Sequence, residues 1–419
     1  MRYDSQGLQI TTDSTAASNA INRFIHQALV YGRDAETSIL EAVAADPDCA
    51  IAHAYTAAYY LSQESAVDRH RATFHLDSAR HHSSSATQRE QLYIQAIAAW
   101  ATGHMTQAIA LHTTLAEQFP QDLLSVQQGQ YHYFYQGDKT GLLHIVETVL
   151  PENANNPYWL GMTAFALEQC HRLAEAEALG RQAIALERHN PWAHHAVAHV
   201  MEMQGRSQDG IAWMESFAPL WDDCNSMLYT HNWWHVALFY LAEGDLQQAL
   251  ALYDQHVWGK ARPDSAKDQV GAIALLLRLE LQGAEVQPYW QQLTPHLLPR
   301  LHEHALPFQD LHYIYALARA DQRHLANEML ASMAAHTQAL PLSQRRVWTE
   351  IVIPAAQGLM AHASGHWHQA IAHLKPVLPH LWQVGGSHAQ RQLFKQVYRN
   401  AQLRGDRYPH VRSPFRLSA

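Results

Sequence analysis

The sequence predicts an all-α fold, a right-handed α-solenoid in which short helical hairpins stack one on the next. Three observations support this expectation. Apolar residues recur at positions i, i+3, i+4 and i+7 along most of the chain, which is the period of an amphipathic helix. Glycine turns separate these segments at nearly regular intervals. The sequence shows no convincing alternation of apolar and polar residues, the pattern of a half-buried strand.

The turns set the length of the repeat. Each places a glycine and a polar residue between two helical segments, and the glycines are Gly103, Gly137, Gly205, Gly244 and Gly365. Gly103 and Gly137 are 34 residues apart, and Gly137 and Gly205 are 68 apart with Cys170-His171 near the midpoint. A 34-residue unit of helix, turn and helix is the period of tetratricopeptide repeats. Each hairpin has an apolar face that a neighbouring hairpin must bury, so we expect a superhelix with a concave inner groove.

The helical pattern is clearest over Thr106–Gln118, Ala174–Glu187 and Asp245–Asp254. Roughly eight to ten hairpins are predicted between residue 17 and about residue 403. After Gly244 the spacing of the turns lengthens to about 39 residues, so the C-terminal half is expected to be less regular. The predicted organisation is an N-terminal segment over 1–18, a single repeat array over 19–403 and a C-terminal tail over 404–419.

Composition narrows the class of protein. The chain has 419 residues, of which 47% are hydrophobic and 16% charged, enough to bury a large core. A formal charge of −9 without a basic stripe argues against a nucleic-acid partner. Three scattered cysteines fit a reducing compartment, and the longest apolar run, Gly271–Leu277, is too short to span a bilayer. We therefore expect a cytoplasmic protein that binds neither membrane nor nucleic acid, and low charge on the outer faces allows a homodimer.

Histidine is unusually frequent, with 31 residues, and four of them are in register. His195 and His199 are spaced i, i+4 in one predicted helix, as are His231 and His235 in another. This spacing puts both rings of a pair on one face of the helix. The two pairs are 36 residues apart, about one repeat, so equivalent helices in adjacent hairpins should bring all four rings together in the groove.

Such a cluster predicts a metal site. Neutral imidazoles with one or two carboxylates suit a divalent transition metal, and zinc or iron is the ion expected here. Glu202 follows His195 by seven residues, about 20° away around the helix, and is predicted to be a further ligand or a catalytic general base. Asp310 is a second candidate for that catalytic carboxylate. Further candidates for ligands, supported less strongly, are Asp254, His256, Asp268, His312 and His53.

A structural interpretation stands beside this one. Three histidine pairs with i, i+4 spacing occur, and the third, His362 and His366, runs into the Gly365 turn, so the spacing alone is weak evidence. Histidines on helices are usually exposed or hydrogen-bonded in the core. The aromatic residues crowded into the same region either wall a small-molecule pocket or fill gaps between hairpins; they are Tyr158, Trp159, Trp192, Trp213, Trp221, Trp233 and Trp234.

Four stretches resemble the tetratricopeptide repeat protein 38 family. They are TQREQLY (87–93), PWAHHAVAHVMEM (191–203), HNWWHVALFYLAEGDLQQALALYDQHV (231–257) and GGSHAQR (385–391). The resemblance covers about 20–400 and implies a single array of helical repeats in a cytoplasmic protein. It implies that the two histidine pairs and Glu202 belong to the family's pattern, and it carries over no catalytic residue.

The sequence supports more than one function. The first is a His-rich site in the concave groove that binds a metal ion or a small molecule, with enzymatic activity left open. The second is a scaffold whose groove takes a peptide or a partner helix, a common use of helical repeats. A haem between facing histidines is a third. The phosphate-binding and serine-hydrolase motifs GxGxxG, GxxxxGK[ST] and GxSxG are absent from the sequence.

Overall fold

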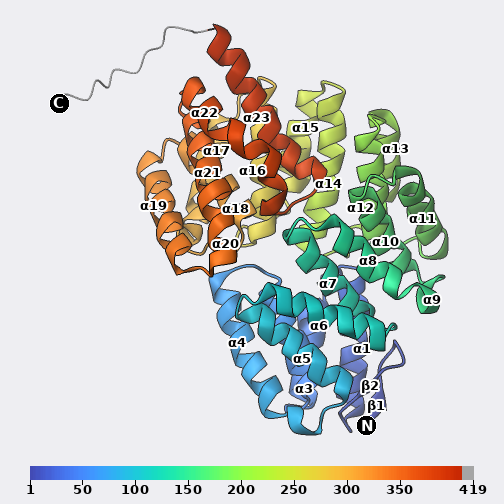
Figure 1. The fold of residues 1–419 in the computed structure, drawn as a ribbon. Coiled ribbons are helices and arrows are strands. Elements are labelled where there is room, and N and C mark those ends of the chain that lie inside the picture. Colours follow the sequence, from blue (N-terminus) through green and yellow to red (C-terminus); the bar gives the residue numbers. More distant parts are fainter. Residues whose placement is uncertain (408–419) are drawn as a thin grey trace. The chain divides into compact units, whose positions relative to one another are not determined.

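The computed structural model describes residues 1–407, and most of the predicted tail over 404–419 lies outside them. The chain forms an all-α helical-repeat solenoid (Figure 1). It divides into two compact units: the first comprises Met1–Leu275 with Gly385–Ala389, and the second comprises Leu276–Val384 and the chain from Gln390 onward. The predicted boundaries of a single array stay a prediction.

The first unit consists almost entirely of paired helices. Its helices are α1 (Thr15–Leu29), α2 (Ala35–Ala45), α3 (Ala50–Leu61), α4 (Ala66–His81), α5 (Gln88–Ala101), α6 (Met105–Gln118), α7 (Leu123–Tyr135), α8 (Lys139–Thr148), α9 (Leu150–Asn153), α10 (Pro157–Gln169), α11 (Leu173–Leu186), α12 (Pro191–Met203), α13 (Ser207–Phe217), α14 (Ser226–Ala242) and α15 (Leu246–Leu252). Short helical turns are η1 (Ser83–Ser85), η2 (Ala218–Leu220) and the π-helical η3 (Tyr253–Val257).

The second unit has the same architecture. Helix α16 (Ala266–Leu281) begins in the first unit and ends in the second. It is followed by α17 (Gln287–Leu297), η4 (Leu298–Arg300), α18 (Pro307–Arg319), α19 (Arg323–Ala339), α20 (Leu342–Val347), the π-helical η5 (Trp348–Val352), α21 (Ile353–Ala363), α22 (Trp367–Val377), η6 (Leu378–Val384) and α23 (His388–Arg407).

The turns within the hairpins have one conformation. At Gly205 the backbone has a φ of +69°, and the amide of Arg206 donates to the carbonyl of Met201 at 2.9 Å. This is the left-handed cap that ends many helices, and glycine adopts it without strain. His171 and Asp321 have φ values of +61° and +60°, so the turn expected near Cys170-His171 is confirmed, and a turn of the same conformation lies at Asp321, although neither contains glycine.

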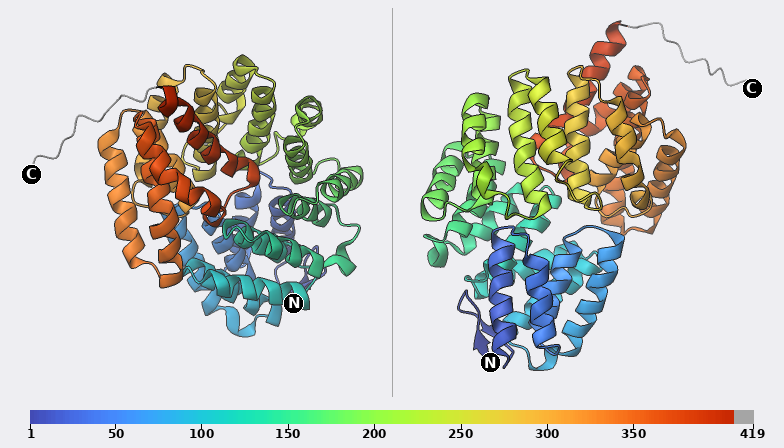
Figure 2. Two further views of the ribbon diagram at one scale, coloured as in Figure 1. Left: turned by 45° about the horizontal axis from the view of Figure 1, so that its top comes forward. Right: turned by 180° about the vertical axis from the view of Figure 1, so that it is seen from behind.

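Successive hairpins pack through their first helices. In the first unit α12 packs against both α10 and α14. Each of these helices also packs against the second helix of its own hairpin: α10 against α11, α12 against α13, and α14 against α15. Figure 2 shows these helices from two further sides. Close packing needs small residues: a Cβ on Gly180 of α11 would lie 2.5 Å from Cγ2 of Val197 on α12. The stacking expected from the repeat period is therefore observed around α12.

The predicted helices agree with the structure except at their ends. The segments expected at Thr106–Gln118 and Ala174–Glu187 are α6 and α11, which begin one residue earlier. The segment expected at Asp245–Asp254 is divided, because α15 ends at Leu252 and a π-helical turn follows. A single wide turn changes neither composition nor apolar period, so periodicity does not reveal it.

The N-terminal segment contains a hairpin that the sequence did not predict. Strands β1 (Arg2–Tyr3) and β2 (Gln9–Ile10) pair antiparallel around Gly7. The Asp4 carboxylate holds the turn by accepting the amides of Gln6 and Leu8, both at 2.9 Å. Two-residue strands are too short to show an alternating pattern, which is why periodicity missed them.

Candidate metal centre

Helices α12 and α14 position the four histidines. Asn190 caps α12 by accepting the amide of Ala193, and Pro191 occupies its first turn, where the missing N–H costs nothing. Asn225 caps α14 through the amide of Leu228. Both helices are first helices of adjacent hairpins and they pack on each other, so residues facing the shared side meet.

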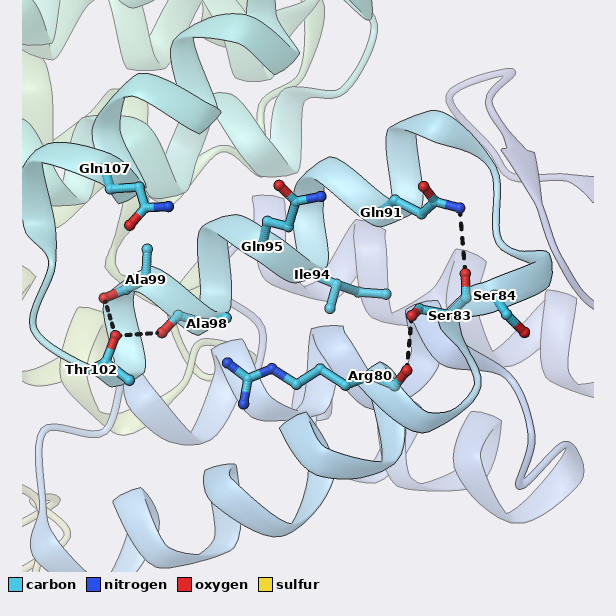
Figure 3. A pocket seen from close by; sticks show the side chains of 10 residues that line it. All are labelled: Arg80, Ser83, Ser84, Gln91, Ile94, Gln95, Ala98, Ala99, Thr102 and Gln107. Carbon is cyan, nitrogen blue, oxygen red and sulfur yellow. Dashed lines mark hydrogen bonds between the residues drawn. The ribbon is translucent and has the colours of Figure 1, made fainter.

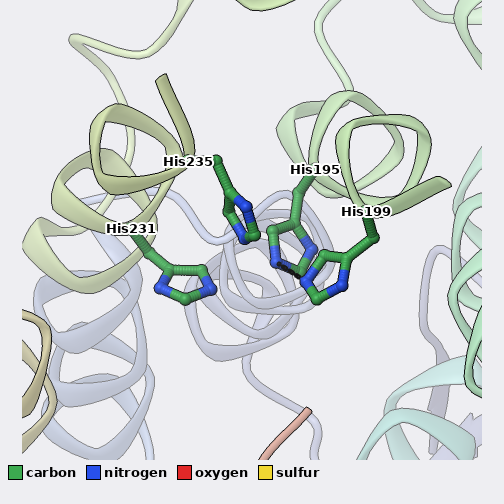
Figure 4. A group of neighbouring side chains, drawn as sticks. All are labelled: His195, His199, His231 and His235. Carbon is green, nitrogen blue, oxygen red and sulfur yellow. Dashed lines mark hydrogen bonds between the residues drawn. The ribbon is translucent and has the colours of Figure 1, made fainter. Parts of the chain in front are cut away.

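The four imidazoles converge on one point (Figure 4). His195 and His199 extend from α12 and His231 and His235 from α14, and one ligand nitrogen from each lies within 4.8 Å of the others. The Nε2 atoms of His195 and His199 are 3.1 Å apart. This is a hydrogen bond in which one ring donates its Nε2–H to the other, and its length is close to the roughly 3.3 Å between two nitrogens bound to one tetrahedral ion at about 2.0–2.1 Å. The structure thus brings together the residues that the sequence analysis paired.

Two carboxylates lie beside Nδ1 atoms of the cluster histidines. Oε2 of Glu202 lies 3.3 Å from Nδ1 of His235, and Oε2 of Glu168 lies 3.6 Å from Nδ1 of His199. A carboxylate beside Nδ1 fixes the tautomer that has its proton on Nδ1 and its lone pair on Nε2. This is the usual support of a metal-binding histidine. Glu168 is fully buried, whereas the Glu202 side chain is 26% exposed. Glu202 therefore lies at the cluster as expected, against a histidine of the neighbouring helix.

Glu168 is not among the residues predicted for the site, although its place in the repeat identifies it. Glu168 is the penultimate residue of α10, and Glu202 is the penultimate residue of α12. The two are 34 residues apart, so they hold equivalent positions in consecutive hairpins. α10 carries no histidine at the cluster positions, and a search that starts from histidine pairs therefore overlooks it.

Burial favours the neutral form of His195 and His231. Burial, aided by the neighbouring histidines, lowers the pKa of His195 well below its usual value and that of His231 to about 3. Burial is the largest single influence and acts to lower the pKa of His199, but the Glu168 and Glu202 carboxylates together outweigh it, so the net shift is upward. Neutral imidazoles offer lone pairs to a metal without competition from protons. Within the described residues, Nδ1 of His195 is buried with no hydrogen-bond partner.

Aromatic side chains enclose the cluster. The ring of Trp192 lies 4.6 Å from that of His195, and Trp234 stacks on His231 at 5.2 Å. Phe165 lies 5.7 Å from both His195 and His199. Such a shell excludes water and strengthens electrostatic interactions inside it. The histidine centroids are 4.5 to 5.0 Å apart, which leaves no room for a porphyrin plane and disfavours the haem interpretation.

The other aromatic residues singled out in the sequence have structural contacts. Trp221 donates to Nδ1 of His194, and Trp233 stacks on His256 at 3.8 Å. Trp213 donates to the carbonyl of His194 and Trp159 to that of Val146. These rings fill gaps between helices, as the structural interpretation expects.

Asp310 lies in the second unit, on α18, where its Oδ2 atom is 2.7 Å from Nδ1 of His304. Its predicted role at the histidine cluster stays a prediction. The weaker candidates make local contacts: His53 lies against His75, Asp268 accepts the amide of Arg262, and His312 bonds the carbonyl of Phe308.

A surface hollow lies elsewhere in the first unit. It has a volume of about 520 Å³ and is lined by side chains of α4, η1, α5 and α6, among them Arg80, Ser83, Gln91, Gln95 and Gln107 (Figure 3). The side chains of Gln91 and Ser83 donate hydrogen bonds to backbone carbonyls of the same region. The hollow contains none of the predicted site residues, and its chemistry indicates no specific ligand.

Comparison with known proteins gives the fold context. No family model matches the chain. The chain is similar to the crystal structure of the APC/C hetero-tetramer Cut9–Hcn1, at 14% identity over 90% of this chain and 69% of that chain, with a TM-score of 0.46. It is also similar to the tetratricopeptide repeat domain of P58(IPK), at 10% identity over 78% of this chain and 100% of that chain, with a TM-score of 0.22. Similarity this distant carries no functional argument, and the fold class rests on the hairpins themselves. Every helix within residues 1–407 is too short or too polar to cross a membrane.

Proposed function

We propose that the cluster of His195, His199, His231 and His235 is a mononuclear site for a divalent transition metal, zinc or iron, built into a tetratricopeptide-like solenoid. The observation that carries the proposal is the meeting of four imidazole nitrogens within 4.8 Å. Four histidines without a cysteine suit zinc or iron better than the soft ions that thiolates select. The bound ion would supply Lewis acidity or an activated water.

The carboxylates of Glu168 and Glu202 have different roles in the proposed site. Glu168 is fully buried, so its role is to orient His199. Glu202 retains exposed surface and lies on His235, so it is placed to act as a general base or an additional ligand toward a small molecule that reaches the ion. His231 is the one partly exposed histidine of the cluster, whereas His195, His199 and His235 are at most 2% exposed. A substrate would therefore approach past His231 and Glu202.

The test is the metal content of the purified full chain. Elemental analysis should find about one zinc or iron per chain, and the double variant His195→Ala, His231→Ala should hold less than a tenth of that amount. His194→Gln is the matched control, because His194 is equally buried in α12 but faces Arg188 and Trp221. Metal far below one per chain in the wild type, even after reconstitution with excess zinc or iron, contradicts the proposal.

The alternative is a scaffold that binds a peptide or partner helix. Helical repeats commonly use their surfaces in this way, and Val67 and Phe74 expose apolar side chains seven residues apart on α4. Binding of such a partner should survive a chelator that removes the metal. We also propose, from the four matching stretches, that the chain belongs to the tetratricopeptide repeat protein 38 family.

A further inference from the structure

A second group of polar side chains lies in the second unit, around Ser332. Oγ of Ser332 is 2.8 Å from Nε2 of His304, and Nδ1 of His304 is 2.7 Å from Oδ2 of Asp310. The serine comes from α19, the histidine from the loop before α18, and the carboxylate from the first turn of α18. Serine, histidine and acid linked in this order by short hydrogen bonds form the arrangement that activates a serine nucleophile.

The base of this group is held firmly. His304 is 6% exposed and has a φ of +47°, a left-handed conformation that a residue with a Cβ adopts at a cost. Such strain persists only where the surroundings impose it, and it often occurs at functional sites. An ion pair between Arg300 and Glu303 at 2.5 Å fixes the loop that precedes His304.

The protonation pattern suits a base. Burial raises the pKa of Asp310 to about 6, against the lowering effect of His304, so the carboxylate is mostly ionised at neutral pH. It accepts Nδ1–H of His304, which leaves Nε2 with the lone pair that receives the serine hydroxyl proton. Asp310 thereby acts as a positioning residue for His304.

A second histidine contacts the same oxygen. Nδ1 of His302 is 2.8 Å from Oγ of Ser332, and its Nε2 is 3.1 Å from Oε1 of Glu328. One hydroxyl proton cannot serve two acceptors, so in this arrangement the hydroxyl donates to Nε2 of His304 and Oγ accepts from Nδ1–H of His302. The contact between Nε2 of His302 and Glu328 holds the exposed His302 ring in this position.

The contacts of Ser332 are unusual for a helical serine. Ser78 and Thr337 donate to the carbonyl four residues earlier in their own helices, the common bond for such hydroxyls. The hydroxyl of Ser332 instead lies between two imidazoles of another segment. Its helical neighbours Ala331 and Ala335 are exposed and small, which leaves room for an electrophile to reach Oγ. Within the described residues, the histidine cluster of the first unit is the one group of ligands close enough to share an ion, so the contacts here do not describe a metal site.

We propose that Ser332, His304 and Asp310 form a nucleophilic centre that accepts an acyl group from a small ester. Oγ bonds to the carbonyl carbon while its proton passes to Nε2 of His304, and the C–O bond to the leaving alkoxide then breaks as the alkoxide takes that proton. Water, deprotonated by the same Nε2, releases the carboxylic acid and restores the hydroxyl. Every atom and proton is supplied by the ester, the water and these side chains.

The experiment is labelling of the full chain with an alkyl fluorophosphonate, in which Oγ displaces fluoride from phosphorus. Intact-mass spectrometry with peptide mapping should find one adduct, on Ser332, and none in Ser332→Ala. Ser78→Ala is the matched control, since this serine is also partly buried in a helix but bonds only its own backbone, and it should label like the wild type. Chelators should leave labelling unchanged, which separates this centre from the proposed metal site.

Two further variants test the base and its positioning residue. His304→Asn suits the left-handed backbone, because asparagine tolerates positive φ, and it should slow labelling at least about tenfold. Asp310→Asn keeps the size of the side chain and should slow labelling by a similar or larger factor through the wrong tautomer of His304. Both should do so at an unchanged unfolding midpoint. Absence of an adduct under conditions that fully label a known serine hydrolase, or equal labelling of Ser332→Ala or His304→Asn and the wild type, would overturn the proposal.

Discussion

Glu168 is a buried carboxylate beside the histidine cluster, and in the proposed metal site it would orient a ligand without binding the ion. Its carboxylate lies on Nδ1 of His199, and Nε2 of Gln169 donates to the same Oε2 atom at 2.5 Å. A fully buried carboxylate is costly unless it is paired and hydrogen-bonded. In the proposed site this carboxylate would hold the proton of His199 on Nδ1, so that the Nε2 lone pair faces the metal.

Replacing Glu168 tests this role. Glu168→Gln keeps the shape of the side chain but removes the charge that stabilises Nδ1–H, so metal affinity should fall by about 10- to 100-fold. Competition with a chromogenic chelator measures the dissociation constant. Glu175→Gln, which changes an exposed glutamate paired with Arg172, is the control and should leave affinity unchanged. Equal affinities for the two variants would show that Glu168 does not support the site.

The hairpin turn is the element that sets the repeat. The conformational free energy of this turn depends on which residue occupies the left-handed position. Gly205 carries the φ of +69° freely, and a Cβ there would meet no atom within 4 Å. Gly205→Ala should therefore destabilise the chain by about 1–2 kcal/mol through conformation alone. Asp321→Gly makes the opposite change at an exposed turn with a φ of +60°. It should raise the free energy of unfolding of the chain by up to about 1 kcal/mol. Denaturant unfolding of both variants measures the two signs, and equal signs would contradict this account of the turn.

Packing between helices connects the turn to the site. Gly180 on α11 faces Val197 on α12, midway between the two cluster histidines of that helix. Gly180→Ala should cost about 1–3 kcal/mol through overpacking and should also weaken metal binding, because α12 must shift. Adding the substitution Val197→Ala makes room for the new methyl group. The double variant should therefore regain part of the lost stability and part of the lost metal affinity. Loss of stability with unchanged metal affinity would show that the site does not depend on this contact.

At the scale of the whole molecule, the metal and the fold should be coupled. An ion that binds only the folded chain stabilises it according to its concentration and affinity, and the ligands come from two hairpins. Removing metal with a chelator should therefore lower the thermal unfolding midpoint of the wild type. The same treatment should not affect the variant His195→Ala, His231→Ala. An equal effect on both proteins would mean that the stabilising ion binds elsewhere.

Buried histidines away from the cluster make stability depend on pH. Burial lowers the pKa of His112 to about 3 and that of His312 to about 4, against an ordinary value of about 6.5. Between those values the unfolded chain binds more protons, so stability is highest above about pH 6.5 and falls as pH falls, by about 1.4 kcal/mol per pH unit for each such histidine.

The slope can be assigned to one residue. His112→Asn retains a polar atom near Ser125, which bonds Nδ1 of His112 at 2.9 Å, but it cannot titrate. The free energy of unfolding of this variant should fall less steeply between pH 6.5 and 4 than that of the wild type. His104→Asn replaces an exposed histidine and is the control. Identical slopes for His112→Asn and the wild type would contradict a neutral buried His112.

The sequence by itself determined the helical class, the repeat and the pairing of the histidines, because these follow from periodicity along the chain. A 36-residue offset between His195 and His231 places both on equivalent helix faces whatever the curvature of the stack. Only the tertiary structure decided which carboxylates meet those rings. Glu168 belongs to a third hairpin, and contact across hairpins depends on side-chain direction and packing, which periodicity does not encode. The link from Ser332 to His304 needed coordinates for the same reason, since a loop in a left-handed conformation carries no periodic pattern.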